Sequence, residues 1–294
     1  ASGAEVTAED VAWLVNRHPR RVLGLAELMN YPGVLARDKS VLAKIAACGC
    51  AVIDGHAPLV AGRELNAYIM AGPSSDHECT NVSEALEKLR KGMHLFMREG
   101  SDEKNLHDLI SVVNEFNAQN VSMVCDDRDP LDLTANGHMD HNVRMAVSLG
   151  MNPIRAIQAA SINTARHFGM RGRGAVAPGY RADMVVLDDL EEFSVWKAFL
   201  AGRDVAGIGF APKGEPTARN TVKINLSGKM LEPSQLEIVK VKDEVRCIGV
   251  IPGQIITRSL TLAPRFEEGL AVGDPYRDLA KLAVVERHGV NGNV

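Results

Sequence analysis

Carboxylates and imidazoles recur in this sequence at the ends of short apolar runs. In the stretch AVIDGHAPLV (51–60), an apolar run stops at Asp54-Gly55 and His56 follows at once. Four other runs end in the same way, at Glu27, Asp76-His77-Glu78, Arg98-Glu99 and Asp126-Asp127. One histidine in such a place is more often a hydrogen-bonded turn residue, but turn chemistry alone does not explain a pattern that recurs along the chain. Carboxylate and neutral imidazole are common ligands of Zn, Mn and Fe, so the pattern predicts a metal site.

The residues of this pattern that we expect to bind metal are Glu27, His56, His77 and Asp126. A buried carboxylate at a strand end costs free energy unless it is paired or bound to metal, which favours a ligand role for Glu27. Asp126 could both bind an ion and move protons. We expect Asp127 to pair with Arg128 or to contact a metal ligand without binding the ion itself.

Other segments with reactive side chains have weaker support. His138 and His141 are three residues apart but lack H-E-x-x-H spacing, so we expect them to pack at a helix start. The glycines of GRGAVAPG (172–179) follow a predicted helix rather than a strand, which argues against a phosphate-binding loop. No G-x-S-x-G occurs, so a serine nucleophile of that kind is not expected.

The elements that would position these residues alternate between residues 20 and 126. The sequence predicts strands at 21–27, 50–55, 73–78, 93–101 and 121–127, and helices at 38–49, 61–72, 81–92 and 103–119. Short strands with a helix between each pair indicate βα repeats on a parallel sheet. The C-terminal ends of parallel strands face one side, where α/β barrels carry their active sites. The polar groups at the strand ends should therefore meet at one rim.

The pattern of predicted elements changes in the second half of the chain. Two further helices are predicted at 138–150 and 152–169, the second with Asn152 as its cap and Pro153 in its first turn. After residue 170, Gly and Pro interrupt short β-branched runs, which predicts antiparallel strands. Further strands are predicted at 221–228, 235–241, 245–251 and 256–262.

Composition excludes several classes of protein. The net charge of −4 and the 4% aromatic content do not suit a nucleic-acid-binding surface. No run of about 18 apolar residues suggests a membrane span, and the polar start of the chain does not resemble a secretory signal. The five cysteines form no C-x-x-C pair, which favours a reduced, cytoplasmic protein, with a soft-metal site at Cys48-Gly49-Cys50 as the alternative.

Eight segments together resemble the adenine deaminases of the amidohydrolase superfamily, from about residue 5 to the end of the chain. They are GLAELMNYPGVL, VIDGHAP, SDHECT, MREGS, CDDRDP, GHMDHNVR, AASINTARHFG and RGAVAPGYRADMVVLDDL. The resemblance implies an α/β fold of the (β/α)8 TIM-barrel type, incomplete here with about five βα units, followed by β-sandwich strands and part of an α+β C-terminal domain. The implied domains are 1–170, 171–213 and 214–294.

The resemblance also implies hydrolytic deamination of adenine to hypoxanthine and ammonia, with a pair of divalent ions, manganese or iron, or alternatively zinc. Glu27, His56, His77 and Asp126 match metal ligands of the family. Asp126 would pass a proton from the attacking water to the leaving amino group. Glu78 would handle the purine or its protons, and Arg98 and Asp127 are further candidates for substrate contact. Small-molecule partners and a homo-oligomer are expected.

One departure from the family pattern matters. The superfamily supplies an H-x-H pair from its first strand, and no H-x-H occurs in these 294 residues. We therefore expect the first three βα units to be missing from this chain, and the chain alone to bind metal weakly and to be weakly active or inactive. Two alternatives stay open: another amidohydrolase, such as a cyclic amide hydrolase, and a non-catalytic remnant that acts as an interaction module.

Overall fold

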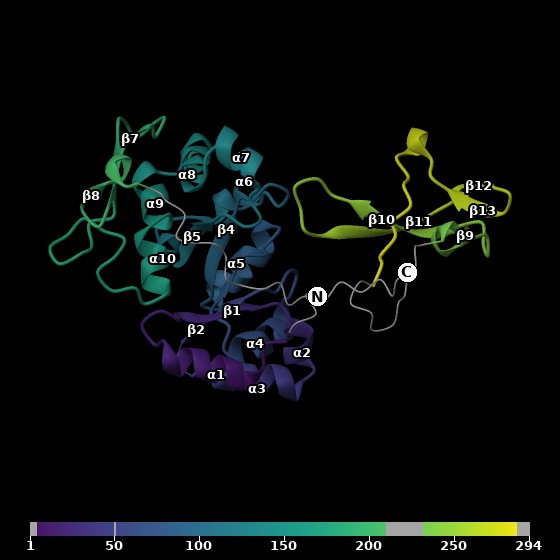
Figure 1. Ribbon diagram of the computed structural model, residues 1–294, viewed down its shortest axis with the longest axis horizontal. Helices are drawn as coiled ribbons and strands as arrows, with labels where there is room; N and C mark the ends of the chain where they lie inside the picture. Colours follow the sequence, from purple (N-terminus) through teal and green to yellow (C-terminus); the bar gives the residue numbers. More distant parts are fainter. Residues whose placement is uncertain (1–4, 50, 210–231, 287–294) are drawn as a thin grey trace. The chain divides into compact units, whose positions relative to one another are not determined.

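The computed structural model describes residues 5–49, 51–209 and 232–286. The described residues fall into two compact units, whose helices and strands are labelled in Figure 1. The larger unit spans Val6–Phe210 and Ile251–Ile256, and the smaller unit contains most of the C-terminal residues. No described helix combines the length and the apolar character that crossing a membrane requires.

Five short parallel strands form the framework of the larger unit: β1 (Gly24–Leu28), β2 (Val52–Gly55), β3 (Ser75–Asp76), β4 (His94–Arg98) and β5 (Val121–Val124). β1 pairs with β2, and β3, β4 and β5 pair in that order. The Ser74 amide donates to the Ile53 carbonyl at 3.0 Å, which joins β2 to the segment leading into β3. A Cβ on Gly55 would lie 2.2 Å from the Ser75 carbonyl oxygen, so this close approach requires glycine. The predicted parallel α/β arrangement is confirmed.

Helices cover these strands and separate them along the chain. They are α1 (Ala8–Arg17), α2 (Tyr31–Leu35), α3 (Lys39–Ala47), α4 (Gly62–Met70), α5 (Val82–Arg90), α6 (Leu106–Leu109), α7 (Pro130–Ala135), α8 (Met139–Ser148), α9 (Pro153–Ala159) and α10 (Ile162–His167). One core packs α1 to α4 against β1 and β2, which lie together in Figure 1. Leu65 is fully buried in this core. A second core packs α5, α6, α8 and α9 against β4 and β5, around Leu95 and Met97. Burial of each such side chain stabilises the fold by roughly 1.5–3 kcal/mol.

Two predicted helices are interrupted. The helix expected at 103–119 consists of α6, a 3-10 turn at Ile110–Val112 and another at Ala118–Asn120. Between the two turns, the Asn114 side chain accepts from the Phe116 and Asn117 amides, and these bonds replace helical ones. The helix expected at 152–169 breaks into α9 and α10 around Ser161, although Asn152 caps it and Pro153 opens it as predicted. The prediction of a single helix was wrong in both places.

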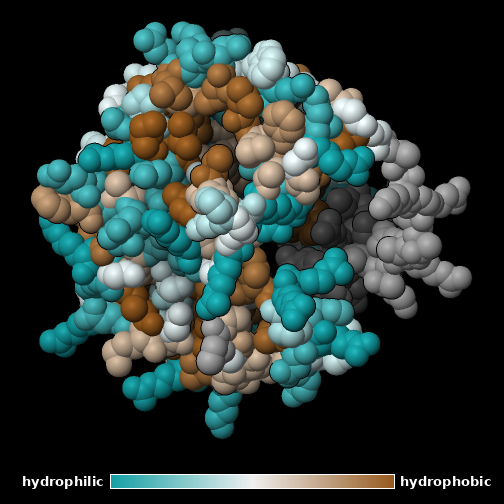
Figure 2. Space-filling view, turned by 90° about the vertical axis from the view of Figure 1, so that its left-hand side faces the viewer, coloured by the Kyte–Doolittle hydropathy of each residue, from teal (hydrophilic) through white to brown (hydrophobic). Residues whose placement is uncertain are grey.

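An antiparallel sheet completes the larger unit, as the sequence predicts: β6 (Met184–Leu187), β7 (Val195–Leu200) and β8 (Arg203–Asp204). Several of its apolar side chains are exposed, among them Val185, Trp196 and Leu200. Figure 2 views the face on which this sheet lies in Figure 1, and hydrophobic patches alternate there with hydrophilic residues. A sandwich would need a second sheet on such a face, so the predicted β-sandwich stays a prediction.

The smaller unit is built from short antiparallel strands. Its elements are η4 (Pro233–Leu236), β9 (Ile238–Val239), β10 (Val245–Val250), β11 (Thr257–Leu262), β12 (Arg265–Glu267), β13 (Leu270–Val272) and η5 (Pro275–Arg277). β10 pairs with β11, and β13 lies between β12 and β9. The strands predicted at 245–251 and 256–262 are confirmed, the segment 235–241 is a strand only at Ile238–Val239, and the segment 221–228 lies outside the described residues. The predicted domain boundaries stay predictions.

The cysteines that the structure describes are free thiols: Cys48, Cys79, Cys125 and Cys247. Cys50 lies outside the described residues, so the alternative of a soft-metal site at Cys48-Gly49-Cys50 stays a prediction.

His94 makes stability depend on pH. Its ring lies 4.5 Å from the His167 ring between centroids, and Nε2 lies 2.8 Å from Ser122 Oγ. Burial, and then the neighbouring His167, lower the pKa of His94 from 6.5 to about 3, so the folded protein keeps this ring neutral. In the unfolded chain the His94 ring binds a proton below about pH 6.5, whereas in the folded protein it stays neutral down to about pH 3. The free energy of unfolding should therefore decrease as the pH is lowered from 6.5 to 3.

The contribution of His94 to this fall is at most about 1.4 kcal/mol per pH unit. Urea unfolding at pH 7 and pH 5 would measure it in the wild type and in His94→Gln. The wild type is expected to lose more stability on acidification than the variant, and equal losses would contradict the assignment.

Candidate metal centre

The residues predicted to do chemistry lie at the C-terminal ends of successive parallel strands. Glu27 is the second-last residue of β1, and Arg98 ends β4. His56 follows β2, His77 and Glu78 follow β3, and Asp126 comes two residues after β5. Ligand atoms of Glu27, His56 and His77 all lie within 4.8 Å of one another. The same holds for His77, Glu78 and Asp126. The two groups share His77, so they form one continuous site.

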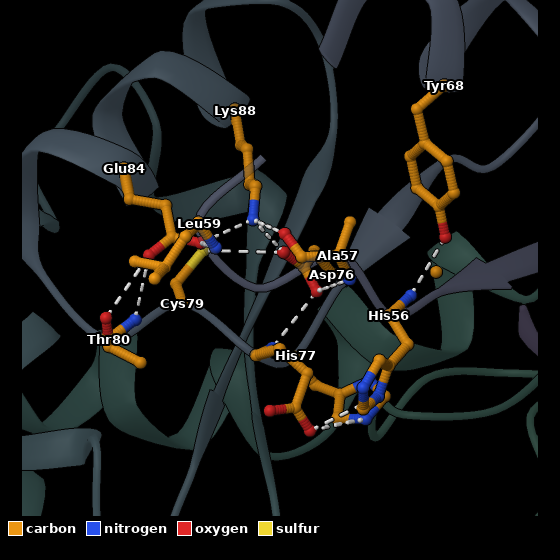
Figure 3. Close-up of polar contacts among 12 residues, drawn as sticks. His56, Ala57, Leu59, Tyr68, Asp76, His77, Cys79, Thr80, Glu84 and Lys88 are labelled. Carbon is orange, nitrogen blue, oxygen red and sulfur yellow. Dashed lines mark hydrogen bonds and ion pairs between the residues drawn. The ribbon is translucent and has the colours of Figure 1, made fainter. Parts of the chain in front are cut away.

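His77 is the centre of this site, and Figure 3 shows its imidazole beside that of His56. Its Nε2 lies 2.7 Å from Glu27 Oε2, 3.3 Å from Glu78 Oε1 and 3.7 Å from Asp126 Oδ2. His56 Nδ1 lies 3.6 Å from Glu27 Oε1 and 3.4 Å from Glu78 Oε1. Three carboxylates and two imidazoles from four strand ends therefore converge on a small volume.

The convergence of these acids and imidazoles shifts their titration. The imidazoles of His56 and His77 hold the pKa of Glu27 well below its usual range. Burial alone would lower the pKa of His77, but hydrogen bonds to Glu27 and Glu78 outweigh it and raise the pKa to about 10. Burial alone would raise the pKa of Glu78, yet His77 and Arg98 lower it. The site is thus a set of anionic oxygens that attracts positive charge.

The guanidinium of Arg98 supports two of these acids from β4. Arg98 is 1% exposed; its Nη1 contacts Glu78 Oε1 and lies 3.3 Å from Asp126 Oδ2. Its Nη2 donates to Asn105 Oδ1 at 3.0 Å, and Asn105 is itself fully buried. Arg98 therefore holds Glu78 and Asp126 on the same side of the site.

The structure does not bring Asp127 into this group. Its side chain is exposed, and its carboxylate makes no hydrogen bond or ion pair within the described part of the chain. Arg128 donates instead to the Glu99 carbonyl and to Asn142 Oδ1, so the expected Asp127–Arg128 pair is absent there. Asp127 also has a positive φ of 35°. Its predicted substrate contact stays a prediction.

His138 and His141 lie at the start of α8, as predicted. Neither belongs to a group that could hold a metal among residues 5–49, 51–209 and 232–286.

The donor set fits a divalent metal ion. One or more carboxylates with two imidazoles is a ligand combination that suits zinc, manganese and iron. The buried Nδ1 of His56 has no hydrogen-bond partner, and neither has the buried Oε2 of Glu78. Buried polar atoms without a partner cost free energy, and a cation bound at the His56 ring would satisfy its Nδ1.

Sequence reasoning missed the residues that hold the ligands from behind. Tyr68 and Lys88 lie on α4 and α5 at positions whose spacing is typical of ordinary helix packing. Tyr68 is fully buried; its hydroxyl accepts from the His56 amide at 3.0 Å and donates to the Leu28 carbonyl at 3.0 Å. It thereby joins the end of β1, which carries Glu27, to the first residue after β2.

Removing the Tyr68 hydroxyl should destabilise the fold. Tyr68→Phe leaves the His56 amide and the Leu28 carbonyl without their partner, and each buried unsatisfied group costs roughly 1–3 kcal/mol. Urea unfolding should show a loss of that order in the free energy of unfolding. Tyr276→Phe is the matched control, because Tyr276 is 98% exposed and should lose almost nothing. An equal effect of the two substitutions would contradict the bridging role.

Comparison with known proteins identifies the family of this chain. The model of the amidohydrolase family matches residues 41–206, which is more than half of the chain. An adenine deaminase from Oleidesulfovibrio alaskensis is 53% identical over 100% of this chain and 51% of its own length. An adenine deaminase from Cereibacter sphaeroides is 44% identical over 99% of this chain and 51% of its own length.

A solved structure of N-acetyl-D-glucosamine-6-phosphate deacetylase from Mycobacterium smegmatis matches with a TM-score of 0.49 and 17% identity, covering 69% of this chain and 60% of that one. The chain spans about half the length of the curated relatives it matches. Because the family model covers most of the βα framework and the polar strand ends from His56 to Asp126, this chain belongs to the amidohydrolase family.

Proposed function

We propose that this chain is the part of a metal-dependent enzyme that deaminates adenine hydrolytically to hypoxanthine and ammonia. The observation that carries the proposal is the convergence of Glu27, His56 and His77 within 4.8 Å, with Asp126 beside them. The relatives named adenine deaminase match the whole of this chain, which supports adenine as the substrate.

Glu27, His56, His77 and Asp126 are the proposed ligands of a divalent metal pair, manganese or iron, with zinc as the alternative. A site of mixed carboxylate and imidazole ligands binds manganese, iron or zinc, and the supply of metal then decides which ion is bound. When bound, such an ion supplies a water whose pKa is low enough for it to attack at neutral pH. The remaining steps belong to the protein's own side chains.

Asp126 is the proposed proton carrier. Its carboxylate accepts a proton from the water as the oxygen bonds to C6 of adenine, and it returns that proton to the amino nitrogen. The C6–N bond then breaks, the nitrogen leaves as ammonia, and the remaining hydroxyl proton moves to ring nitrogen N1, which gives hypoxanthine. The Arg98 guanidinium, 3.3 Å from Asp126 Oδ2, holds the carboxylate in place without becoming a proton donor itself.

Glu78 and Arg98 are the proposed contacts to the purine. Glu78 has a buried oxygen without a partner in the site, and a purine nitrogen could satisfy it. Arg98 fixes the other oxygen of Glu78, so this carboxylate would present its free oxygen in one orientation. Such a fixed acceptor can distinguish the donor and acceptor pattern of adenine from that of other bases.

The five parallel strands form the proposed incomplete TIM barrel. An eight-stranded barrel closes only with three further strands, and an open parallel edge is a liability without them. On this proposal the chain alone binds metal weakly and turns adenine over slowly, the working enzyme is cytoplasmic, and it forms a homo-oligomer.

The test is an assay of the full protein with adenine and added Mn²⁺, in which ammonia and hypoxanthine are both measured. Equal amounts of the two products, dependent on metal, are expected. Hydrolysis of cyclic amides without deamination of adenine would contradict the proposal and favour a different amidohydrolase. A full protein with neither activity would favour a non-catalytic interaction module, and rapid turnover by this chain alone would refute the expected need for further strands.

A further inference from the structure

A buried lysine lies behind the candidate metal ligands. Lys88 is 1% exposed and projects from α5 toward the loops that follow β2 and β3 (Figure 3). Its Nζ contacts Asp76 Oδ2 and lies 2.7 Å from Glu84 Oε1 and 2.7 Å from the Ala57 carbonyl oxygen. Asp76 is fully buried and Glu84 is 7% exposed. Burying three charges costs free energy, so the arrangement has to be fully hydrogen-bonded to persist.

Asp76, Glu84 and Lys88 form a buried charged triad. Within it, the Asp76 carboxylate bonds to backbone groups next to His56 and His77. Asp76 Oδ1 accepts from the Ala57 amide at 3.2 Å and from the Glu78 amide at 3.0 Å. These two amides belong to the residues that directly follow the two histidines. One carboxylate therefore connects the loop that carries His56 to the loop that carries His77.

Glu84 also connects these two loops, at residues further along the chain from the two histidines. Its Oε1 accepts from the Leu59 amide at 2.7 Å, and its Oε2 accepts from the Thr80 amide at 3.1 Å. Leu59 lies in the loop after β2, and Thr80 lies in the loop after β3. Lys88 binds both carboxylates, so its ammonium is the element common to both connections.

The triad is not itself a metal site. Asp76, Cys79 and Glu84 have ligand atoms close enough together to hold an ion. The Lys88 ammonium, however, already contacts both carboxylates, so the position of the cation is taken by a side chain.

We propose that Lys88 is a positioning residue for the metal centre: with Asp76 and Glu84 it fixes the spacing between the loops that carry His56 and His77. This inference rests on the proposed function, because it assumes that the two histidines bind metal. Without the ammonium, Asp76 and Glu84 would repel each other while still bonded to both loops. The loops would then separate, and the imidazoles would lose their common geometry.

The test compares Lys88→Met with a matched substitution of Lys91, the C-cap residue of the same helix. Lys91 also contacts the glutamate four residues before it, Glu87, at 2.7 Å, and donates to a backbone carbonyl, that of Gly62, at 2.8 Å. Its partners are Glu87 and the first residue of α4, so Lys91→Met removes a carboxylate and a carbonyl contact of a lysine without removing a contact to Asp76 or Glu84. The probe is Co²⁺ bound to the full protein, because its visible absorption reports coordination geometry.

Lys88→Met is expected to retain its circular dichroism, to bind Co²⁺ about 10-fold or more weakly, and to change the absorption spectrum of the bound ion. Lys91→Met should retain wild-type affinity and spectrum. If Lys88→Met does not fold, Glu84→Gln replaces it, since it keeps the Lys88–Asp76 pair and should show a smaller change in the same direction.

A folded Lys88→Met or Glu84→Gln protein with wild-type Co²⁺ affinity and spectrum would overturn the positioning role alone. A wild-type protein that binds no Co²⁺ would overturn the proposed metal site and, with it, this inference. The two failures are therefore distinguishable.

Discussion

Replacing Asp126 with asparagine is expected to lower kcat for adenine by roughly 10²–10⁴-fold in the full protein. Asparagine has nearly the same shape but can neither accept nor return a proton, and positioned acid–base groups contribute factors of this size. The substitution also removes one of the carboxylates around His77, whose Nε2 lies 3.7 Å from Asp126 Oδ2. Steady-state rates of ammonia release, measured with saturating Mn²⁺, check the prediction.

Asp129→Asn is the matched control for this substitution. Asp129 lies in the same segment after β5 and accepts from the Asp132 amide at 2.8 Å as the N-cap of α7. Asparagine caps helices about as well as aspartate, so fold and activity should both be retained. If Asp126→Asn kept more than a tenth of the wild-type kcat, Asp126 would not be the proton carrier.

Replacing Arg98 with methionine should lower the free energy of unfolding by about 3–5 kcal/mol. Glu78 is 1% exposed, and without Arg98 its carboxylate would remain buried with only the imidazoles of His56 and His77 close to it. Removing one partner of a buried ion pair typically has a cost of this size, because the remaining charge stays buried after losing its closest counter-charge. Urea unfolding of the wild type and the variant at neutral pH measures the difference.

Two further variants make this measurement specific. Arg144→Met removes a partly exposed ion pair with Asp140 at 2.9 Å, and such pairs contribute only about 0–1 kcal/mol. Glu78→Gln combined with Arg98→Met removes both charges and should recover part of the lost stability. A loss in Arg98→Met no larger than that in Arg144→Met would show that Glu78 does not need its guanidinium.

Much of the framework could be predicted from the sequence because the relevant signals are local. Apolar runs that end in a polar residue identified the strand ends, and β4 is buried along its whole length, as expected for a parallel strand. Parallel order then placed His56 and His77 at the same rim, although they are 21 residues apart in the sequence. Their binding of metal stays a prediction.

The remaining features depend on contacts that no local pattern contains. The segment 103–119 has helical periodicity, but the Asn114 side chain bonds to the backbone in competition with the helix. Lys88 lies at a helix position whose spacing is typical of ordinary helix packing, and only the folded chain shows that its ammonium is buried against Asp76. Asp127 is exposed and has a positive φ, whereas the adjacent Asp126 lies beside His77, and no local pattern distinguishes the two residues.

The most direct test of the metal centre is an anomalous difference map at the manganese absorption edge, from crystals of the full protein grown with Mn²⁺. A peak within bonding distance of the Glu27, His56 and His77 side chains is the predicted result. Manganese bound elsewhere while these three side chains point away from one another would contradict the account.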